Sequence, residues 1–222
     1  MNKKIIYAVL IIFVIVSTLI TYNVYKKGNV SELKKVSLRL KWINQAQFAG
    51  YYLANNQKLY ATKGLEVEIN PGGPDVSPVQ MVVTGVNDFG ITGADQIILA
   101  REKGIPLVAL AVLYKDSPVT ILSLEKNGIK KPKDLEGKKI EVVYGRDEEV
   151  IYKILLEKEG VDRKKIEEVP SLADWSRVIS GQVDARVDYE LNGGILLPLQ
   201  GFPVNLIKPR DYGIKFYADT LF

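Results

Sequence analysis

Aromatic and amide side chains are concentrated in one short stretch of the chain, residues 42–52, which reads WINQAQFAGYY. Aromatic rings offer flat stacking faces and amides offer paired donors and acceptors, a combination that suits a planar, hydrogen-bonding ring. We therefore expect ligand contacts here from Trp42, Asn44, Gln47 and Tyr51. A structural alternative stands beside this one: the aromatic residues form the buried face of the first helix, and Trp42 fills the floor between two lobes.

Two glycine-containing loops follow, each placed between an apolar run and a helical pattern. Residues 71–75 read PGGPD and residues 92–96 read TGADQ. Because glycine lets backbone amides approach a ligand closely, the candidate contacts are Gly72, Gly73, Gly93, Ala94 and Asp95. A phosphate loop is excluded, since its Lys-Ser/Thr pair and glycine spacing are missing. The competing interpretation is a structural turn in which Asp75, and in the second loop Asp95, caps the helix that follows.

The second half of the chain carries comparable loops. Residues 144–147 read YGRD, residues 184–192 read DARVDYELN, and a Ser-Pro pair stands at 117–118. The candidate contacts here are Ser117, Tyr144, Gly145, Asp188, Tyr189 and Asn192. Trp42 and Tyr189 stand in loops of opposite halves, and we predict that they sandwich a flat ligand.

These candidates stand mostly at the ends of apolar runs of strand length, where helical patterns begin. We predict strands at 36–41, 65–69, 88–91, 107–113, 119–124, 139–143, 166–169, 183–187 and 204–207. Helical patterns occupy 47–58, 76–84, 95–103, 148–159, 173–180 and 192–199. This alternation predicts an α/β fold with a largely parallel sheet covered by helices on both faces. Such sheets bind ligands outside the carboxyl ends of their strands, where the loops with candidate contacts are expected.

A break in the alternation, at residues 113–118, divides the chain. There YKDSP joins two apolar strands without a helix between them, as expected of a crossover from one lobe to another. We predict a first lobe over residues 36–116 and a second lobe over residues 117–208. Residues 209–222 are predicted to be a return segment towards the first lobe, with the rest of that lobe expected beyond them.

Composition removes several classes of function. The chain has no cysteine and no histidine, which excludes disulfides, thiol nucleophiles, Cys/His zinc sites and histidine bases. Four lysines flank the first apolar segment; without them the 30 basic residues become 26, equal to the 26 acidic residues. The body of the protein is therefore neutral, which argues against nucleic acid as a partner. No cofactor, metal or catalytic residue is expected.

Residues 5–24 are uncharged and mostly aliphatic, with a lysine pair before them and another after them. A length of about 20 residues matches a helix that crosses the hydrocarbon core of a membrane. No convincing cleavage site follows, and the chain lacks the cysteine that a lipoprotein needs. We expect an uncleaved signal anchor over residues 1–28 and a tether over residues 29–35.

Several motifs together resemble a known family. They are LKWINQAQFAGYYLA, PGGPDVSPVQ, NDFGITGADQIILAREKGIPLVALA, SPV, IKKPKDLEGKKI, GQVDARVDYELN and DYGIKFYADTLF, which span residues 36–222. In content, order and spacing they resemble the NMT1/ThiY-like (SsuA/THI5-like) solute-binding proteins of ABC transporters, the branch linked to thiamine-pyrimidine precursors and riboflavin. The resemblance implies a periplasmic-binding-protein fold of type II, with two lobes that close on a small heterocyclic ligand. It also implies a body outside the cytoplasm that hands the ligand to an ABC permease in the cell membrane.

The sequence departs from this family at two places. Members often carry Asn-Glu-Pro after the tyrosine, whereas here Asn192 is followed by Gly193 and Gly194, so the acidic group expected at a polar ring edge is absent. Members also continue beyond the region that matches residues 211–222, so the resemblance implies a C-terminally truncated version. A related pyrimidine synthase uses an internal histidine and a cysteine-rich iron site, and neither residue type occurs here.

Two functions remain open at this point. The first is an extracytoplasmic solute-binding protein of an ABC importer for a thiamine-pyrimidine precursor or riboflavin-like heterocycle. The second is the ligand-sensing domain of a truncated membrane receptor of the kinase or cyclase type. An enzyme is not expected, because no Lys, Asp or Tyr site for catalysis can be assembled from the sequence.

Overall fold

The computed structural model describes residues 11–19, 21 and 32–222. Residues 11–19 are helical, and none of the helices described is long and apolar enough to cross a membrane. Most of the predicted anchor, and residues 29–31 of the predicted tether, lie outside the described residues. The last two residues of the predicted tether belong to the first strand, which begins at Lys34, and Lys34 pairs with Leu65.

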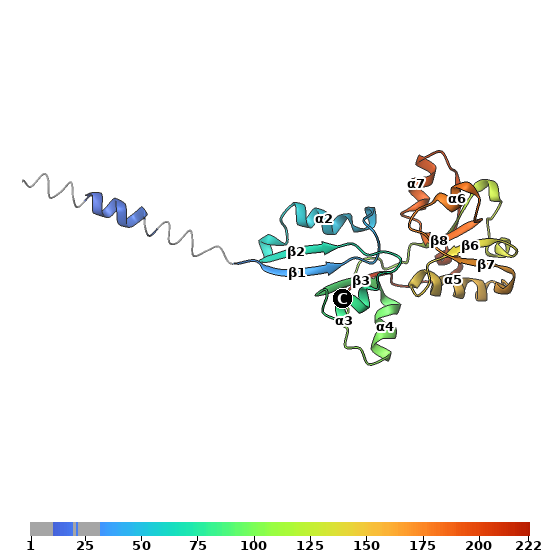
Figure 1. The fold of residues 1–222 in the computed structure, drawn as a ribbon, viewed down its shortest axis with the longest axis horizontal. Coiled ribbons are helices and arrows are strands. Elements are labelled where there is room, and N and C mark those ends of the chain that lie inside the picture. The colour runs from blue at the N-terminus through green and yellow to red at the C-terminus, as the bar shows by residue number, and fades with distance from the viewer. Residues whose placement is uncertain (1–10, 20, 22–31) are drawn as a thin grey trace, which may run out of the picture.

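The first sheet has the strand order β2-β1-β3-β10-β4, and we call the part of the molecule built on it lobe 1 (Figure 1). Its strands are β1 (Lys34–Arg39), β2 (Leu65–Asn70), β3 (Phe89–Gly93), β4 (Ala111–Val112) and β10 (Asp219–Leu221). Helix α2 (Ala49–Asn56) covers one face, and α3 (Pro78–Val83) and α4 (Ala94–Glu102) cover the other. Short 3-10 turns at Ala46–Phe48 and Ala61–Lys63 flank α2.

The second sheet has the order β7-β6-β8-β5-β9 and defines lobe 2. Its strands are β5 (Val119–Leu124), β6 (Lys139–Val142), β7 (Glu167–Pro170), β8 (Ala185–Tyr189) and β9 (Val204–Ile207). Helix α5 (Asp147–Lys158) packs on one face, and α6 (Ser176–Ser180) and α7 (Gly193–Leu199) pack on the other (Figure 1). Short 3-10 turns occupy Glu125–Asn127, Pro132–Leu135, Arg163–Lys165 and Pro209–Tyr212.

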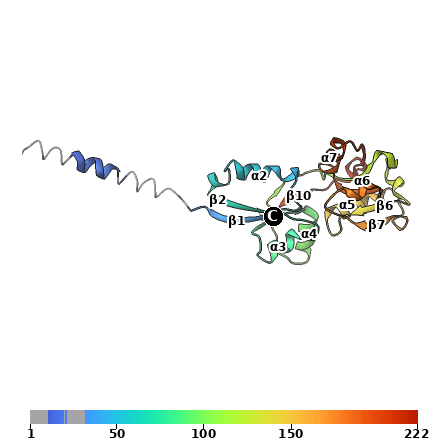
Figure 2. The same ribbon diagram turned by 45° about the horizontal axis from the view of Figure 1, so that its top comes forward.

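Both sheets are mixed, and the predicted largely parallel sheet is wrong in this respect. In each lobe three neighbouring strands run parallel, and two further strands join them in antiparallel pairs. The antiparallel half of lobe 1 depends on β10, which lies between β3 and β4. Figure 2 places β10 and the C-terminus inside lobe 1. The chain therefore crosses between the sheets twice, once at residues 113–118 and again at residues 208–218.

Two local predictions also need correction. The predicted strand at residues 107–113 shrinks to Ala111–Val112, because β10 pairs with those two residues only. The cap of α3 is Ser77, whose Oγ accepts a hydrogen bond from Gln80 N at 3.3 Å, and not Asp75. At α4 the cap position belongs to Gly93, and Asp95 lies one residue inside the helix.

Candidate functional site

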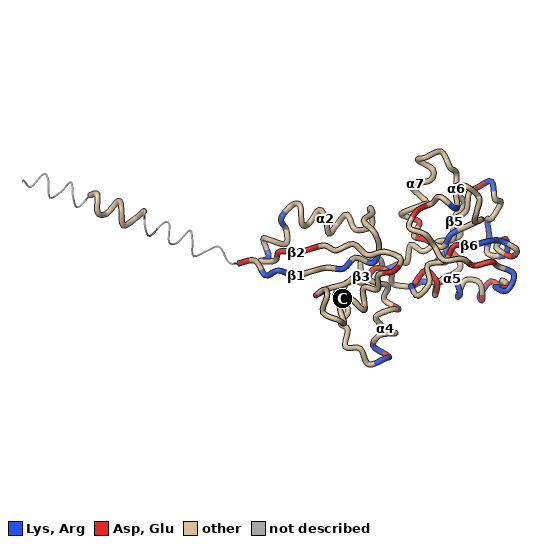
Figure 3. The backbone as a smooth tube through the Cα atoms, in the orientation of Figure 1, with Lys and Arg blue, Asp and Glu red and all other residues tan. Residues whose placement is uncertain are grey.

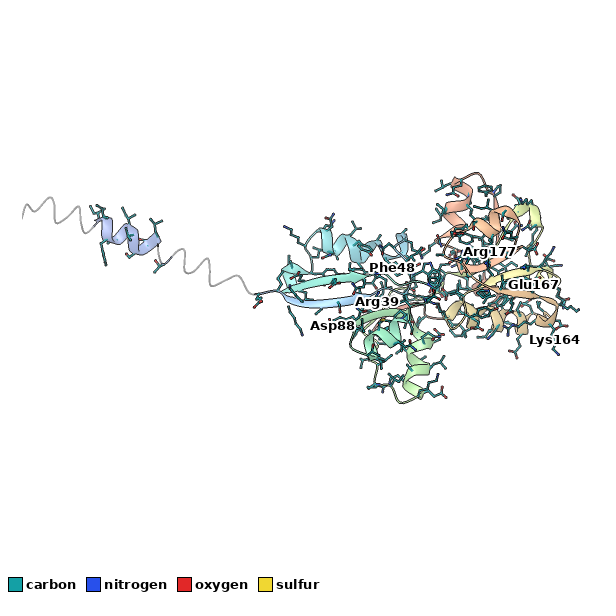
Figure 4. All side chains as sticks on the ribbon, in the orientation of Figure 1. Arg39, Phe48, Asp88, Lys164, Glu167 and Arg177 are labelled. Atoms are coloured by element: carbon teal, nitrogen blue, oxygen red, sulfur yellow. The ribbon has the colours of Figure 1, made fainter. Side chains whose placement is uncertain are left out.

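The two lobes meet at the carboxyl ends of β1, β3, β6 and β8, and side chains fill the space between them (Figure 4). Lys41 and Trp42 follow β1, and both are buried. Asp147 and Glu148 open α5 from the other lobe, and they too are buried. The loop after β1 and the first turn of α5 thus face each other across the interface.

A cluster of buried ionisable groups joins the lobes; we call it the inter-lobe charge cluster and define it as Lys41, Asp147, Glu148, Tyr189 and Asp219. The Lys41 ammonium donates to Asp147 Oδ1 and, at 2.7 Å, to Tyr189 Oη. It lies 3.2 Å from Glu148 Oε1 and 3.9 Å from Asp219 Oδ1. Tyr189 Oη is also 2.9 Å from Asp147 Oδ2 and 3.1 Å from Asp219 Oδ1. One ammonium therefore serves three carboxyl groups, two from lobe 2 and one from lobe 1.

Burial and mutual charge set the protonation of this cluster. Burial alone would lower the pKa of Lys41, but the three carboxyl groups around it outweigh burial and raise that pKa. Burial opposes the ionisation of Asp147, and the Lys41 charge overcomes it, so the pKa of Asp147 is lowered. Burial and then the negative charge of Asp147 raise the pKa of Glu148 to about 8. Burial likewise raises the pKa of Asp219. At neutral pH the cluster therefore holds an ionised Lys41–Asp147 pair beside a protonated Glu148.

Arg146 is a second link between the lobes. Its guanidinium donates to the carbonyl oxygens of Lys41, Gly73 and Val76, all in lobe 1. The same guanidinium lies over the Trp42 ring, 4.9 Å from its centroid, in cation–π geometry. Because Arg146 belongs to lobe 2, these contacts hold the lobes together in a closed arrangement.

Three hollows lie along the interface. The smallest, of about 10 Å³, lies beside the charge cluster and is lined by Lys41, Trp42, Gln45, Gln47, Val143, Glu148, Asp188 and Tyr189. We call it the central cavity; its volume is about that of one water molecule. A groove of about 400 Å³ runs between α3, α4 and residues 144–146, and another of about 280 Å³ runs between residues 45–47 and α7. Among the three, the central cavity alone is lined by aromatic rings from both lobes, Trp42 and Tyr189, and it adjoins the charge cluster, which makes it the candidate ligand site.

A family model described as NMT1/THI5 like matches residues 45–222 of the chain. The chain belongs to the NMT1/THI5-like family. The match covers most of lobe 1 and all of lobe 2, including every residue that lines the central cavity except Lys41 and Trp42.

Two curated relatives show what other proteins with similar sequences bind. The formylaminopyrimidine-binding protein of Halalkalibacterium halodurans is 25% identical over 191 residues, which are 85% of this chain and 58% of that protein. The riboflavin-binding protein RibY of Chloroflexus aurantiacus is 26% identical over 185 residues, 81% of this chain and 52% of that protein. The chain thus spans a little more than half the length of these relatives.

A solved structure supports the fold. The alkanesulfonate-binding protein SsuA from Xanthomonas axonopodis pv. citri superposes with a TM-score of 0.66 over 86% of this chain and 66% of that protein, at 18% identity. The predicted two-lobed α/β fold of the periplasmic-binding-protein kind is thereby confirmed.

Some of the residues predicted from sequence meet at the central cavity of this family member. Trp42, Gln47, Asp188 and Tyr189 all line it. Gln47 Nε2 donates to Asp219 Oδ2 at 3.0 Å, and Asp188 Oδ1 accepts from Tyr189 N at 2.6 Å. The rings of Trp42 and Tyr189 each have a cationic side chain over them, because Lys41 Nζ lies 4.3 Å from the Tyr189 ring centroid. The predicted sandwich of a flat ligand between these rings stays a prediction.

Predicted glycine contacts bring backbone segments together. A Cβ atom at Gly72 would lie 2.3 Å from Leu40 O, so this glycine lets the 71–75 loop pass against the end of β1. A Cβ at Gly93 would lie 2.9 Å from Asp147 Cβ, so Gly93 makes room for the charge cluster. Gly73 offers its carbonyl to Arg146. These three glycines position the interface.

The other predicted contacts lie around the cavity and do not line it. Asn44 is exposed and accepts from Tyr52 Oη, and Ser117 Oγ accepts from Val119 N at 3.3 Å. Tyr144 and Gly145 line the 400 Å³ groove, and Asn192 lines the 280 Å³ groove. Tyr51, Ala94 and Asp95 are half-buried in lobe 1; Asp95 Oδ2 accepts from Gln96 at 2.8 Å.

The sequence interpretation missed the residues that dominate the site. Lys41, Arg146, Asp147, Glu148 and Asp219 were not among the predicted contacts. One signal was available for Lys41: a lysine at the end of an apolar strand, next to a tryptophan, in a position where such sheets bind ligands. Asp147 and Glu148 look like ordinary first-turn acidic residues of a helix, so no signal marked them.

Proposed function

We propose that this chain is the solute-binding component of an ABC importer for a thiamine-pyrimidine precursor or a riboflavin-like heterocycle. The observation that carries the proposal is the convergence, on one cavity between two lobes, of two aromatic rings with amide and carboxyl groups. That combination suits a flat ring with polar edges. Family membership and the names of the relatives support the same ligand class.

Binding requires the lobes to move apart, because the central cavity holds no more than about one water molecule. Only two segments connect the sheets, residues 113–118 and residues 208–218. Rotation about these two segments would break the Arg146 contacts with lobe 1 and uncover Trp42 and Tyr189. The ligand would then be enclosed when Arg146 returns to the lobe 1 carbonyls.

The wider setting belongs to the same proposal. A body outside the cytoplasm, an N-terminal signal anchor in the cell membrane and a permease partner fit an importer component. The polar groups at the central cavity pair with one another across the lobes, which suits capture of a solute better than attack on a bond. We therefore propose a binding protein and not an enzyme.

Ligand-dependent melting of the full chain in mild detergent tests this function. A ligand that binds only the folded state raises Tm in proportion to the logarithm of its concentration. We expect 4-amino-5-hydroxymethyl-2-methylpyrimidine or riboflavin to raise Tm in this way, and an alkanesulfonate of similar size to leave it unchanged. A folded sample whose Tm responds to neither heterocycle would refute the proposal.

Intrinsic fluorescence locates the ligand. The chain has two tryptophans, Trp42 at the central cavity and Trp175 in the core of lobe 2. We expect the bound heterocycle to quench fluorescence in Trp175→Phe, which keeps Trp42, and to leave the fluorescence of Trp42→Phe unchanged. Equal quenching in both variants would place the ligand elsewhere.

A further inference from the structure

The inter-lobe charge cluster draws its charged groups from both sides of the hinge. Lys41 and Asp219 belong to lobe 1, whereas Asp147 and Glu148 open α5 in lobe 2. The side chains of Lys41, Asp147 and Asp219 are 3% exposed or less, and that of Glu148 is 8% exposed. Separation of the lobes would therefore take the cluster apart and bring buried charged groups into water.

The closed arrangement holds a proton inside this cluster. Lys41 alone neutralises at most one of the three carboxyl groups that surround it. The side chains of Asp147 and Glu148 share a hydrogen bond with each other. An ionised carboxylate can only accept hydrogen bonds, so one member of this pair must be protonated. Asp147 already accepts from Lys41 and Tyr189, which leaves Glu148 as the donor.

The open arrangement would not retain that proton at neutral pH. Once lobe 1 moves away, Asp147 and Glu148 face water in the first turn of α5, where the helix dipole favours negative charge. A glutamate in water has a pKa of 4.5. Glu148 would therefore ionise when the lobes separate and bind a proton again when they close.

We infer that closure of the two lobes takes up a proton from the solvent, which the Glu148–Asp147 pair holds, so that acidic solution favours the closed arrangement and alkaline solution the open one. The inference rests on the proposed function in requiring the lobes to move about their two connecting segments. The proton does not contact the ligand. It acts by neutralising a carboxyl group that lobe 1 would otherwise bury as a second negative charge beside Asp147.

The groups around this carboxyl pair set the pH range of the effect. Those that face the pair are Arg146 before α5, Asp95 on α4, Lys41 after β1, Asp188 and Tyr189 on β8, and Asp219 on β10. Lys41 and Arg146 favour ionised Glu148, but burial and the charge of Asp147 outweigh them and raise the pKa of Glu148 to about 8. The preference for closure is therefore fully present below about pH 4.5 and is lost as the pH rises through about 8.

Distances between spin labels on the full chain in mild detergent test the inference without any ligand. The chain has no cysteine, so introduced cysteines are labelled specifically. Asn56→Cys at the end of α2 and Gln200→Cys after α7 are exposed positions in different lobes, and Figures 1 and 2 both show these helices on the same side of the molecule. We expect the ratio of closed to open molecules to fall about 10-fold between pH 7 and pH 9, as release of one proton with a pKa of about 8 implies.

Three controls separate closure from other effects of pH. Gln182→Cys with Gln200→Cys places both exposed labels in lobe 2, and their distance should not change. In the inter-lobe pair, Glu148→Gln still donates to Asp147 but cannot titrate, so the ratio should stay within about two-fold over the same pH range. Glu157→Gln, at an exposed position on the same helix, should behave as the wild type. Circular dichroism confirms that each variant is folded.

Calorimetry counts the proton in the wild-type chain. Titrations at pH 7 use riboflavin or 4-amino-5-hydroxymethyl-2-methylpyrimidine, whichever raises Tm, in buffers of different ionisation enthalpy. The slope of the observed enthalpy against the ionisation enthalpy gives the number of protons taken up on binding. We expect the wild type to take up about one proton more than Glu148→Gln.

The outcomes distinguish this inference from the proposed function. If the inter-lobe distance of the wild type does not respond to pH, or responds equally in Glu148→Gln, the inference is overturned whether or not a ligand binds. Equal proton uptake by the two chains overturns it as well. Failure of both heterocycles to bind would overturn the proposed function, while the distances measured without ligand would still decide whether closure takes up a proton.

Discussion

Lobe 2 and lobe 1 are built on five-stranded sheets of the same mixed kind but differ in how well their apolar surface is covered. In lobe 2 strand β5, which lies between β8 and β9, is buried at every residue, and α5 buries Ile151, Tyr152, Leu155 and Leu156 beneath the sheet. In lobe 1 the edge strand β4 is exposed at both residues, and Ile98 on α4 and Val108 before β4 are 67% and 64% exposed.

The helices show the same contrast in charge. Helix α5 carries acidic residues in its first turn and Lys158 in its last, whereas α2 and α3 contain no charged residue, as Figure 3 makes visible. The buried cluster at the heart of lobe 1 also includes Val143, which belongs to lobe 2. The buried core of lobe 2 takes in Ile214 and Ala218 from the connecting segment but no residue of the lobe 1 sheet or helices, while the core of lobe 1 is completed by a residue of lobe 2.

Replacing Lys41 by Met is the most severe test of that dependence. It would leave Asp147 and Asp219 buried without their cation, and breaking a buried pair in this way costs about 3–5 kcal/mol. We expect a loss of that size in urea unfolding followed by circular dichroism. Lys35→Met is the matched control, since Lys35 and Glu66 are exposed and 4.0 Å apart, and its effect should stay within about 1 kcal/mol. Equal effects of the two substitutions would show that the cluster does not hold the lobes together.

Truncation of a buried leucine sharpens the contrast between covered and uncovered surface. Leu155 is completely buried in lobe 2, so Leu155→Ala should destabilise the protein by about 2–5 kcal/mol. Ile98→Ala removes a largely exposed side chain from lobe 1 and should change stability by no more than about 0.5 kcal/mol. Urea midpoints measure both. A large loss from Ile98→Ala would mean that this surface is covered in the folded protein.

The strands differ in how well the sequence predicts them. Strands that pair over four or more residues were predicted well: 119–124 and 204–207 match β5 and β9 at both ends. The failure at residues 107–113 has a physical cause, because that run pairs with only two residues of β10, Thr220 and Leu221, which lie more than a hundred positions away in sequence. A three-residue strand with a remote partner leaves no local pattern.

The site residues also divide into those that the sequence predicts and those that it does not. Residues at strand ends, such as Trp42 and Tyr189, could be predicted, because the carboxyl ends of parallel strands gather at one edge of the sheet. The burial of Lys41 and Asp219 could not be predicted, since nothing local marks a charged residue for burial; the position of Lys41 beside Trp42 at a strand end indicates only that it lies near the site. Each becomes buried only when lobe 2 brings Asp147 and Tyr189 against it.

The interface between the lobes should also respond to pH. The folded state raises the pKa of Glu148 from 4.5 to about 8, so between these values the native protein binds a proton that the unfolded chain releases. The resulting stability is fully present below about pH 4.5 and is lost as the pH rises through about 8. We expect Tm to fall by several degrees between pH 5 and pH 8.5 on this account. Glu148→Gln should flatten that fall, whereas Glu157→Gln, which is exposed, should keep it.

The smallest effect expected is at the cap of α3 in lobe 1, where sequence and structure disagree about the residue. Ser77 Oγ accepts from Gln80 N at 3.3 Å, so Ser77→Ala should cost about 0.5–2 kcal/mol in urea unfolding. Asp75→Ala should change stability by less than about 0.5 kcal/mol, because Asp75 is exposed and lies before the cap. If Asp75→Ala destabilised the protein more than Ser77→Ala does, Asp75 would be the cap of α3. A larger loss of stability from Ser77→Ala would show that lobe 1, although its apolar surface is less well covered, depends on a specific hydrogen bond at the start of α3.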